Sequence, residues 1–190
     1  MFYVFFTWHL LVTKDTENVL LKVIVSLSLP TTATVGVPLS IYFGTMTGTE
    51  GLVLFTDQYV PYFRVIGIFT YLTGLLLLIT TNYYFINQGN GTLSPLIPTT
   101  KLVVDGPYKY VRNPMLAGIL YMIVGEVLFF NMTRLLFFAI FFFVLNTIFF
   151  MFKEEPDLKE KFEEEYVEYS KHVNRWIYRF TPYVPEKKQL

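Results

Sequence analysis

Four long apolar runs constrain the fold of this chain more than any other feature. A transmembrane helix needs about 20 mostly apolar residues to cross about 30 Å of hydrocarbon. The runs that approach this length lie at residues 23–43, 60–86, 114–130 and 135–152. Only residues 131–134 separate the last two runs, so these should form a tight antiparallel hairpin. The sequence therefore predicts an all-α integral membrane bundle of about four transmembrane helices.

Two parts of this prediction stay open at the N-terminal end. Pro30 and Pro38 interrupt the first run, where each removes a backbone hydrogen-bond donor. Residues 2–12 are apolar but too short to span, and we interpret them as an interfacial segment rather than a signal peptide. If they insert, the bundle has five transmembrane helices.

Composition agrees with a membrane protein and excludes several classes of function. Only 16% of the residues are charged, against about 25% in a typical soluble domain. Acidic and basic residues both number 15, so the chain lacks the cationic excess that binding to nucleic acid requires. It has no cysteine and two histidines. Disulfides, Cys-ligated zinc and a His-rich metal site are therefore excluded, and we expect no metal.

The distribution of basic residues predicts an orientation. With four spans, all but two of the 15 Lys and Arg residues fall on one side, and only Arg64 and Arg134 fall on the other. The positive-inside rule then places both termini in the cytoplasm. No linker divides the chain, so residues 1–190 form a single domain. Residues 1–86 supply the interfacial segment and two spans, and residues 87–190 supply a polar loop, the hairpin and a C-terminal helix.

The polar loop that precedes the third run is the first candidate for a binding site. Glycines and prolines between residues 89 and 98 forbid a regular helix there, and residues 105–107 (DGP) predict a turn. Pro114 suits the first turn of the helix that follows. The free N–H groups at such a helix N-terminus can bind a carboxylate or a phosphate. An ordinary loop that returns to the membrane would look the same in composition.

The second candidate region follows the fourth run. Glu154 and Glu155 lie side by side where that run ends, and Pro156 can open a new helix. Apolar residues then recur at helical spacing: Leu158, Phe162, Tyr166, Tyr169, Val173 and Trp176. This amphipathic helix is too acidic to lie on anionic lipid, so we expect it to pack back over the loops. The two glutamates also fit helix-start acids that favour the macrodipole.

These two regions together resemble a known enzyme family. The resemblance is carried by residues 106–115 (GPYKYVRNPM), 154–158 (EEPDL) and 162–169 (FEEEYVEY), in this order and spacing. They are similar to the isoprenylcysteine carboxyl methyltransferase family, and the related phospholipid N-methyltransferases share the pattern. The resemblance covers residues 88–180, about half of the chain.

The resemblance implies a helical membrane enzyme that uses S-adenosyl-L-methionine without a Rossmann domain. It makes Arg112, Glu154 and Glu155 the candidate catalytic residues. The cofactor-binding residues that it implies are Lys101, Leu102, Val103, Tyr108, Asn113, Pro114, Met115, Leu116 and Glu154. Asn113 and Leu116 replace the His and Tyr that are commoner in the family, and Phe150 stands where isoprenylcysteine enzymes tend to have Arg.

The expected function is methyl transfer to a lipid or prenylated acceptor at the membrane. Phospholipid N-methylation and small-thiol methylation are the alternatives within the same chemistry, and a non-catalytic membrane scaffold is the alternative outside it. Tyr108, Tyr110 and Trp176 could face the cofactor sulfonium but also fit an interfacial aromatic belt. Glu126 lies inside the third run, and we expect a structural or snorkelling role for it.

Overall fold

A computed structural model describes residues 27–28, 30–46, 53–89 and 100–185. Its long helices are α3 (Val37–Met46), α4 (Val60–Gly89), α5 (Pro114–Phe130), α6 (Thr133–Phe149) and α7 (Glu155–His172). Three short helical segments join them: η1 (Thr32–Gly36), η2 (Gly106–Lys109) and η3 (Phe150–Glu154). The described residues contain no β-strand, only an isolated bridge between Val53 and Met132. The expected all-α class is therefore confirmed.

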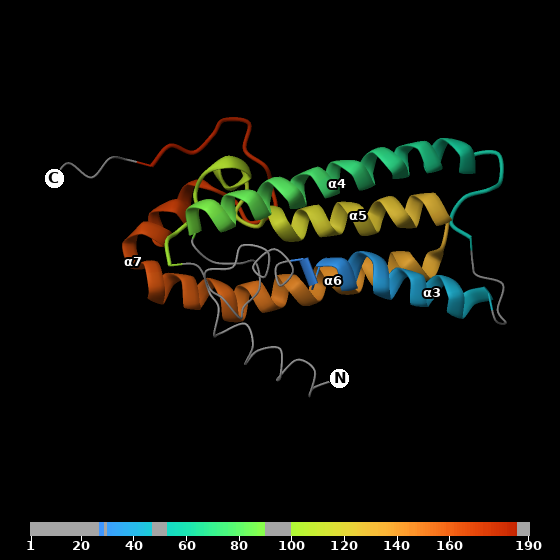
Figure 1. Cartoon of the computed structure of the whole chain (residues 1–190), viewed down its shortest axis with the longest axis horizontal. Helices are drawn as coiled ribbons and strands as arrows, with labels where there is room; N and C mark the ends of the chain where they lie inside the picture. Colours follow the sequence, from blue (N-terminus) through green and yellow to red (C-terminus); the bar gives the residue numbers. More distant parts are fainter. Residues whose placement is uncertain (1–26, 29, 47–52, 90–99, 186–190) are drawn as a thin grey trace.

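Helices α3, α4, α5 and α6 lie roughly parallel to one axis, with α4 and α5 on one side and α3 and α6 on the other (Figure 1). Two helices within the described ranges are long and apolar enough to cross a membrane: α4, and the continuous helix Thr133–His172. The shorter apolar helix α5 has 17 residues, which makes it about 26 Å long. These helices coincide with the second, third and fourth apolar runs.

Glycines bring α4 and α5 into backbone contact. A Cβ atom built on Gly74 would lie 2.5 Å from the carbonyl oxygen of Gly118, and one on Gly67 would lie 2.7 Å from that of Gly125. Both distances are shorter than ordinary van der Waals contact, so only glycine fits at this separation. The seven-residue spacing on both helices fixes their antiparallel register.

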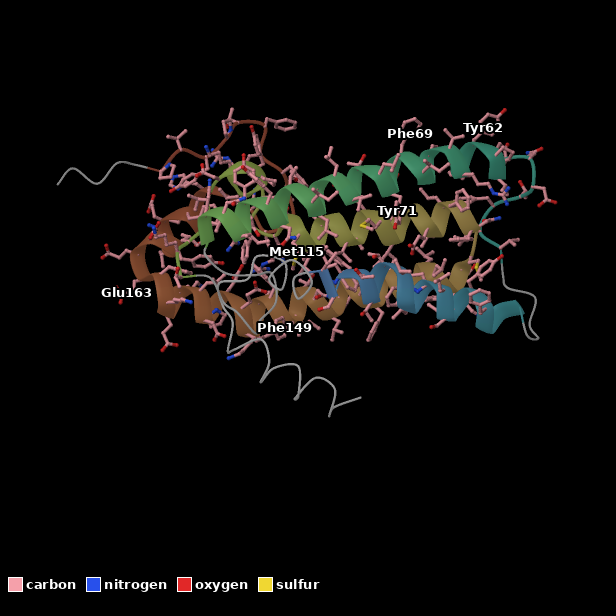
Figure 2. All side chains as sticks on the ribbon, in the orientation of Figure 1. Tyr62, Phe69, Tyr71, Met115, Phe149 and Glu163 are labelled. Atoms are coloured by element: carbon pink, nitrogen blue, oxygen red, sulfur yellow. The ribbon has the colours of Figure 1, made fainter. Side chains whose placement is uncertain are left out.

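Apolar side chains both fill the bundle and cover its outside. The core consists of Leu78, Leu116, Ile119, Met122, Ile123, Val127, Leu135 and Ala139. Outside it, Tyr62 and Phe69 point away from α4, and Phe149 points away from α6 (Figure 2). Such an extended apolar exterior suits lipid rather than water as the surrounding solvent.

The turn between α5 and α6 is as short as the sequence predicted. Asn131 ends α5 in the left-handed conformation, with φ of 55°. Its side-chain oxygen accepts hydrogen bonds from the backbone N–H groups of Leu54 (3.0 Å) and Phe55 (2.8 Å). Its side-chain amide donates to the carbonyl of Phe55 at 2.9 Å. Asn131 therefore ties the segment before α4 to the tip of the hairpin.

Pro38 does not break the helix in which it lies. Residues on both sides of η1 are helical, and η1 itself is a π-helical turn, whose wider spacing accommodates the missing N–H group of Pro38. The hydroxyl of Thr34 donates to the carbonyl of Pro30 at 2.9 Å. The expected interruption is therefore a local widening of a helix that continues to Met46.

The expectation of one regular amphipathic helix after the fourth run was wrong in its geometry. Glu163 has φ of 44° and ψ of −123°, and this kink turns α7 back toward the bundle (Figures 1 and 2). The helix ends at His172, and Val173 is already extended. The expected packing over the loops is confirmed, because Tyr166, Tyr169, Val173 and Tyr183 form a core with Leu102, Val104, Leu158 and Phe162.

Candidate active site

The loop before α5 is held by the end of α4. Gly106 has φ of 58°, and a Cβ atom there would collide with the ring of Tyr84. Glycine is therefore needed at this turn both for its backbone angles and for space. One turn later along the loop, the ring of Tyr108 lies 5.7 Å from that of Phe85. The turn predicted at residues 105–107 thus starts η2 against α4.

The segment after α7 binds the same loop from the other side. Three backbone hydrogen bonds join the two segments: Arg112 N–H to Asn174 C=O (2.9 Å), Arg179 N–H to Tyr110 C=O (2.9 Å), and Tyr183 N–H to Lys109 C=O (3.0 Å). The loop therefore lies between α4 and the returning C-terminal segment, and its backbone conformation is fixed by both.

Two buried tyrosines, Tyr169 of α7 and Tyr108 of the loop, add a further contact between these segments. The hydroxyl of Tyr169 donates to the carbonyl of Tyr108 at 2.7 Å. Burial, and after it the neighbouring Tyr169 and Glu154, raises the pKa of Tyr108 well above its usual value. Both tyrosines are therefore neutral at physiological pH. Tyr108 is a core residue here and not part of an interfacial belt.

Glu155 is the centre of a charge cluster that joins α7, the loop and the C-terminal segment. It is 8% exposed, and its Oε1 atom accepts from Arg112 at 2.8 Å and from the Nε and Nη2 atoms of Arg175 at 3.0 and 2.9 Å. Arg112 also donates to the hydroxyl of Tyr166 at 3.3 Å. The guanidinium of Arg175 lies 5.8 Å from the centre of the Phe150 ring.

Glu154 has a different environment from its neighbour. Its side chain remains accessible to solvent, and among the described residues it has no hydrogen bond or ion pair. The surrounding protein restricts its hydration, and this desolvation, followed by the charges of Asp157 and Glu155, raises the pKa of Glu154 to about 7. Glu154 is thus an accessible carboxyl group whose charge no cation in the described chain compensates.

Asn113 and the start of α5 contribute hydrogen-bond donors beside this cluster. Asn113 is buried, and its side-chain nitrogen has no hydrogen-bond partner. Pro114 occupies the first turn of α5, as predicted. The N–H groups of Met115 and Leu116 in that turn have no acceptor within the helix. A buried amide without a partner is costly, and a polar ligand at this end of α5 would supply the missing acceptor.

Thr81 and Asn82 belong to the same end of the bundle and were not among the predicted site residues. The side-chain oxygens of both are buried without a partner. The register of Gly74 opposite Gly118 places Asn82 about 12 Å further along α4, level with the loop before α5. The only sequence signal for them is a polar pair near the end of an apolar run.

The predicted site residues separate into two groups. Tyr108, Arg112, Asn113, Glu154 and Glu155 lie in or beside one cluster, although about 40 residues separate them in sequence. The others serve the packing or face solvent: Leu102 lies against the Tyr166 core, Val103 is buried, Met115 and Leu116 pack in or against the bundle core, and Lys101 is exposed. Arg175 joins the cluster from outside the predicted set.

One comparison with known proteins matches the chain. A family model described as phospholipid methyltransferase matches residues 62–165, which is more than half of the sequence. The match begins in α4 and ends in α7, so it includes Arg112, Asn113, Glu154 and Glu155 but not Arg175. No match to a curated protein or to a solved structure was found.

Proposed function

The chain belongs to the phospholipid methyltransferase family of integral membrane methyltransferases, and from this premise we propose that it transfers a methyl group from S-adenosylmethionine to the amine of a phospholipid headgroup. The observation that carries the proposal is a pair of neighbouring charges of opposite sign. The accessible carboxyl group of Glu154 lies next to a cluster in which Arg112 and Arg175 share the single carboxylate of Glu155.

The donors and acceptors near α5 fit the polar groups of the proposed cofactor. Glu154 would accept from the cofactor ammonium, a charge-assisted interaction. The side-chain amide of Asn113 and the first N–H groups of α5 would donate to its carboxylate. The orphaned nitrogen of Asn113 is the observation that supports this fit, because a bound carboxylate would supply its missing acceptor.

The arginine cluster fits the anionic part of the acceptor. Two guanidinium groups and one carboxylate leave a net charge of +1 on the cluster, which suits a phosphate. The side chain of Arg175 is 22% exposed, so an incoming headgroup can reach it. The phosphate would then lie at Arg175 while the headgroup amine points toward the methyl donor.

The chemistry asks the protein for alignment and for an unprotonated headgroup amine, whose proton would pass to solvent. When bound, S-adenosylmethionine supplies a methyl group on a sulfonium whose leaving group is a neutral thioether. Glu154, Asn113 and the start of α5 would hold the cofactor, and Arg175 would hold the acceptor lipid. Such positioning contributes roughly 7–11 kcal/mol in well-aligned reactions. No residue of the cluster needs to act as a covalent nucleophile.

Methylation of a prenylated cysteine carboxylate is the second candidate, and one observation favours it. Phe150 stands at the position where we expected the cation for that carboxylate, and the guanidinium of Arg175 lies over its ring. Arg175 can therefore bring a positive charge to the place that Phe150 leaves neutral. A carboxylate acceptor would bind the same arginine cluster as a phosphate.

The identity of the product tests both candidates. Membranes that contain the protein are incubated with methyl-labelled S-adenosylmethionine, and the labelled product is treated with base. A base-stable methyl group on a lipid amine supports N-methylation, and a base-labile ester supports the second candidate. Absence of label in any lipid or thiol, from protein that still binds S-adenosylhomocysteine, would contradict both and leave a non-catalytic role.

We further propose that the chain crosses the membrane four times with both termini in the cytoplasm. The site then faces the cytoplasm, from which a water-soluble cofactor can reach it. The chain has no cysteine, so single cysteines can be introduced at Lys101 and Asp57, which are both exposed. In intact cells an impermeant thiol reagent should label the cysteine at Asp57 but not the one at Lys101. Labelling in the opposite pattern would reverse the orientation.

A further inference from the structure

A cavity lies in the bundle, away from the charge cluster. It has a volume of about 330 Å³ and is lined by α3 with η1, the first half of α4, and the last turns of α5. This is within the size range of small-molecule pockets. Most of its wall is apolar, and Glu126 supplies the charged group in it.

Glu126 is only 9% exposed, and its Oε2 atom is buried without a hydrogen-bond partner. Of the structural or snorkelling role expected from the sequence, its burial argues against snorkelling, because a snorkelling carboxylate reaches toward water. An ionisable group inside a span is costly unless another group compensates it. Tyr71, which lies on the side of α4 that faces the other helices (Figure 2), adds a second polar group to the wall.

The cavity is separate from the proposed methyl-transfer site. Glu126 comes twelve positions after Pro114 in α5, and the helical rise converts this to about 18 Å along the axis. The two sites therefore lie toward opposite ends of α5. A small ligand in one cannot contact the side chains of the other.

The wall of the cavity opens to the outside of the bundle. Val35 and Leu39 from one helix, and Ile68 and Leu72 from another, line the cavity and are also exposed. In a membrane these side chains face the hydrocarbon, so a ligand would enter sideways from the lipid. Apolar walls beside a carboxyl group with one buried, unpartnered oxygen fit an apolar molecule with one polar group.

We propose that this cavity binds a membrane amphiphile that carries a hydrogen-bond donor, a hydroxyl or an amino group, with that donor on Glu126. A donor fits either protonation state, because both the carboxylate and the neutral carboxyl group have an oxygen that accepts. The apolar tail lies along the side chains of α3 and α4. This site is independent of the proposed methyl transfer and of the arginine cluster.

Photo-crosslinking tests the proposal on the full chain in phosphatidylcholine nanodiscs. The probes are hexadecylamine, hexadecanol and hexadecyl methyl ether, each with a diazirine in the tail. The amine and the alcohol carry a donor, whereas the ether has nearly the same shape without one. We expect the two donor probes to label cavity residues about tenfold more than the ether, the scale of one hydrogen bond.

Two variants of Glu126 separate the carboxyl group from the shape of the cavity. Glu126→Leu should lower alcohol and amine labelling to the level of the ether. Glu126→Gln keeps an acceptor oxygen and should retain alcohol labelling. Both should bind S-adenosylhomocysteine like the native protein, which shows that the fold is intact and keeps this test separate from the proposed activity. Equal labelling by all three probes, or donor labelling unchanged in Glu126→Leu, would overturn the proposal.

Discussion

Acidification should weaken the binding of S-adenosylhomocysteine, the product of the proposed cofactor, because it protonates Glu154. Desolvation raises the pKa of this carboxyl group to about 7 in the free protein. A bound ammonium favours its charged form, so S-adenosylhomocysteine should bind best above that pKa and progressively less well below it. Glu154→Gln removes the titrating group and should remove this pH dependence while it lowers affinity at neutral pH.

The size of the effect follows from the pKa. For one linked proton, the apparent Kd is multiplied by one plus the ratio of protonated to ionised carboxyl group. With a pKa of about 7, this factor is about 1.3 at about pH 7.5 and about 11 at about pH 6. The Kd of the native protein should therefore rise about eightfold over this range, and that of Glu154→Gln should stay level.

Calorimetry with purified protein in detergent measures the Kd for S-adenosylhomocysteine of the native protein and of Glu154→Gln at each pH. Glu164→Gln is the matched control, because Glu164 is an exposed glutamate on α7 and the substitution makes the same charge change. Asn113→Ala should weaken binding without flattening the pH profile, and its effect should not add to that of Glu154→Gln, because both groups would hold one ligand. A pH profile of Glu154→Gln as steep as that of the native protein would refute the assignment.

Three further substitutions test the fold around the site by thermal unfolding in detergent. Gly74→Ala forces the facing helix backbone, 2.5 Å from the new Cβ atom, to move and should cost about 1–3 kcal/mol, whereas Gly44→Ala, with nothing within 4 Å, should cost far less. Glu155→Gln leaves two partly buried arginines without their carboxylate and should cost up to about 3–5 kcal/mol, whereas Asp157→Asn breaks an exposed pair and should cost under about 1 kcal/mol. Tyr169→Phe removes a buried hydrogen bond and should cost about 1 kcal/mol. Equal melting temperatures within either matched pair, or an unchanged one for Tyr169→Phe, would contradict these assignments.

The hairpin could be predicted from the sequence because its ends carry local signals. Pro114 can only open a helix, Asn131 tolerates the left-handed conformation, and the apolar run between them has helical length. α5 accordingly begins and ends where expected. The sequence also predicts that Arg112 approaches Glu155, because the short turn of the hairpin brings the start of α5 and the end of α6 to the same end of the bundle.

The contacts made by the returning C-terminal segment could not be predicted in the same way. The kink that reverses α7 is at Glu163, which is neither a glycine nor a proline and gives no local signal. Without that reversal nothing in the sequence indicates that Arg175 shares a carboxylate with Arg112. Thr81 and Asn82 were missed for a related reason: their depth follows from the register of α4 against α5, which contacts between helices determine.

The attachment of residues 174–183 to the loop before α5 also sets an order of events during synthesis. A chain emerging from the ribosome can complete α4, α5 and α6 and pack them by nearest-neighbour contacts. The charge cluster lacks Arg175 until that residue has been made, and the loop lacks the last of its backbone partners until Tyr183 has been made. Nascent chains halted before this point should therefore integrate as a bundle that has no competent site. We therefore expect the proposed site to form in one late step, when residues 174–183 make their long-range contacts with the loop before α5.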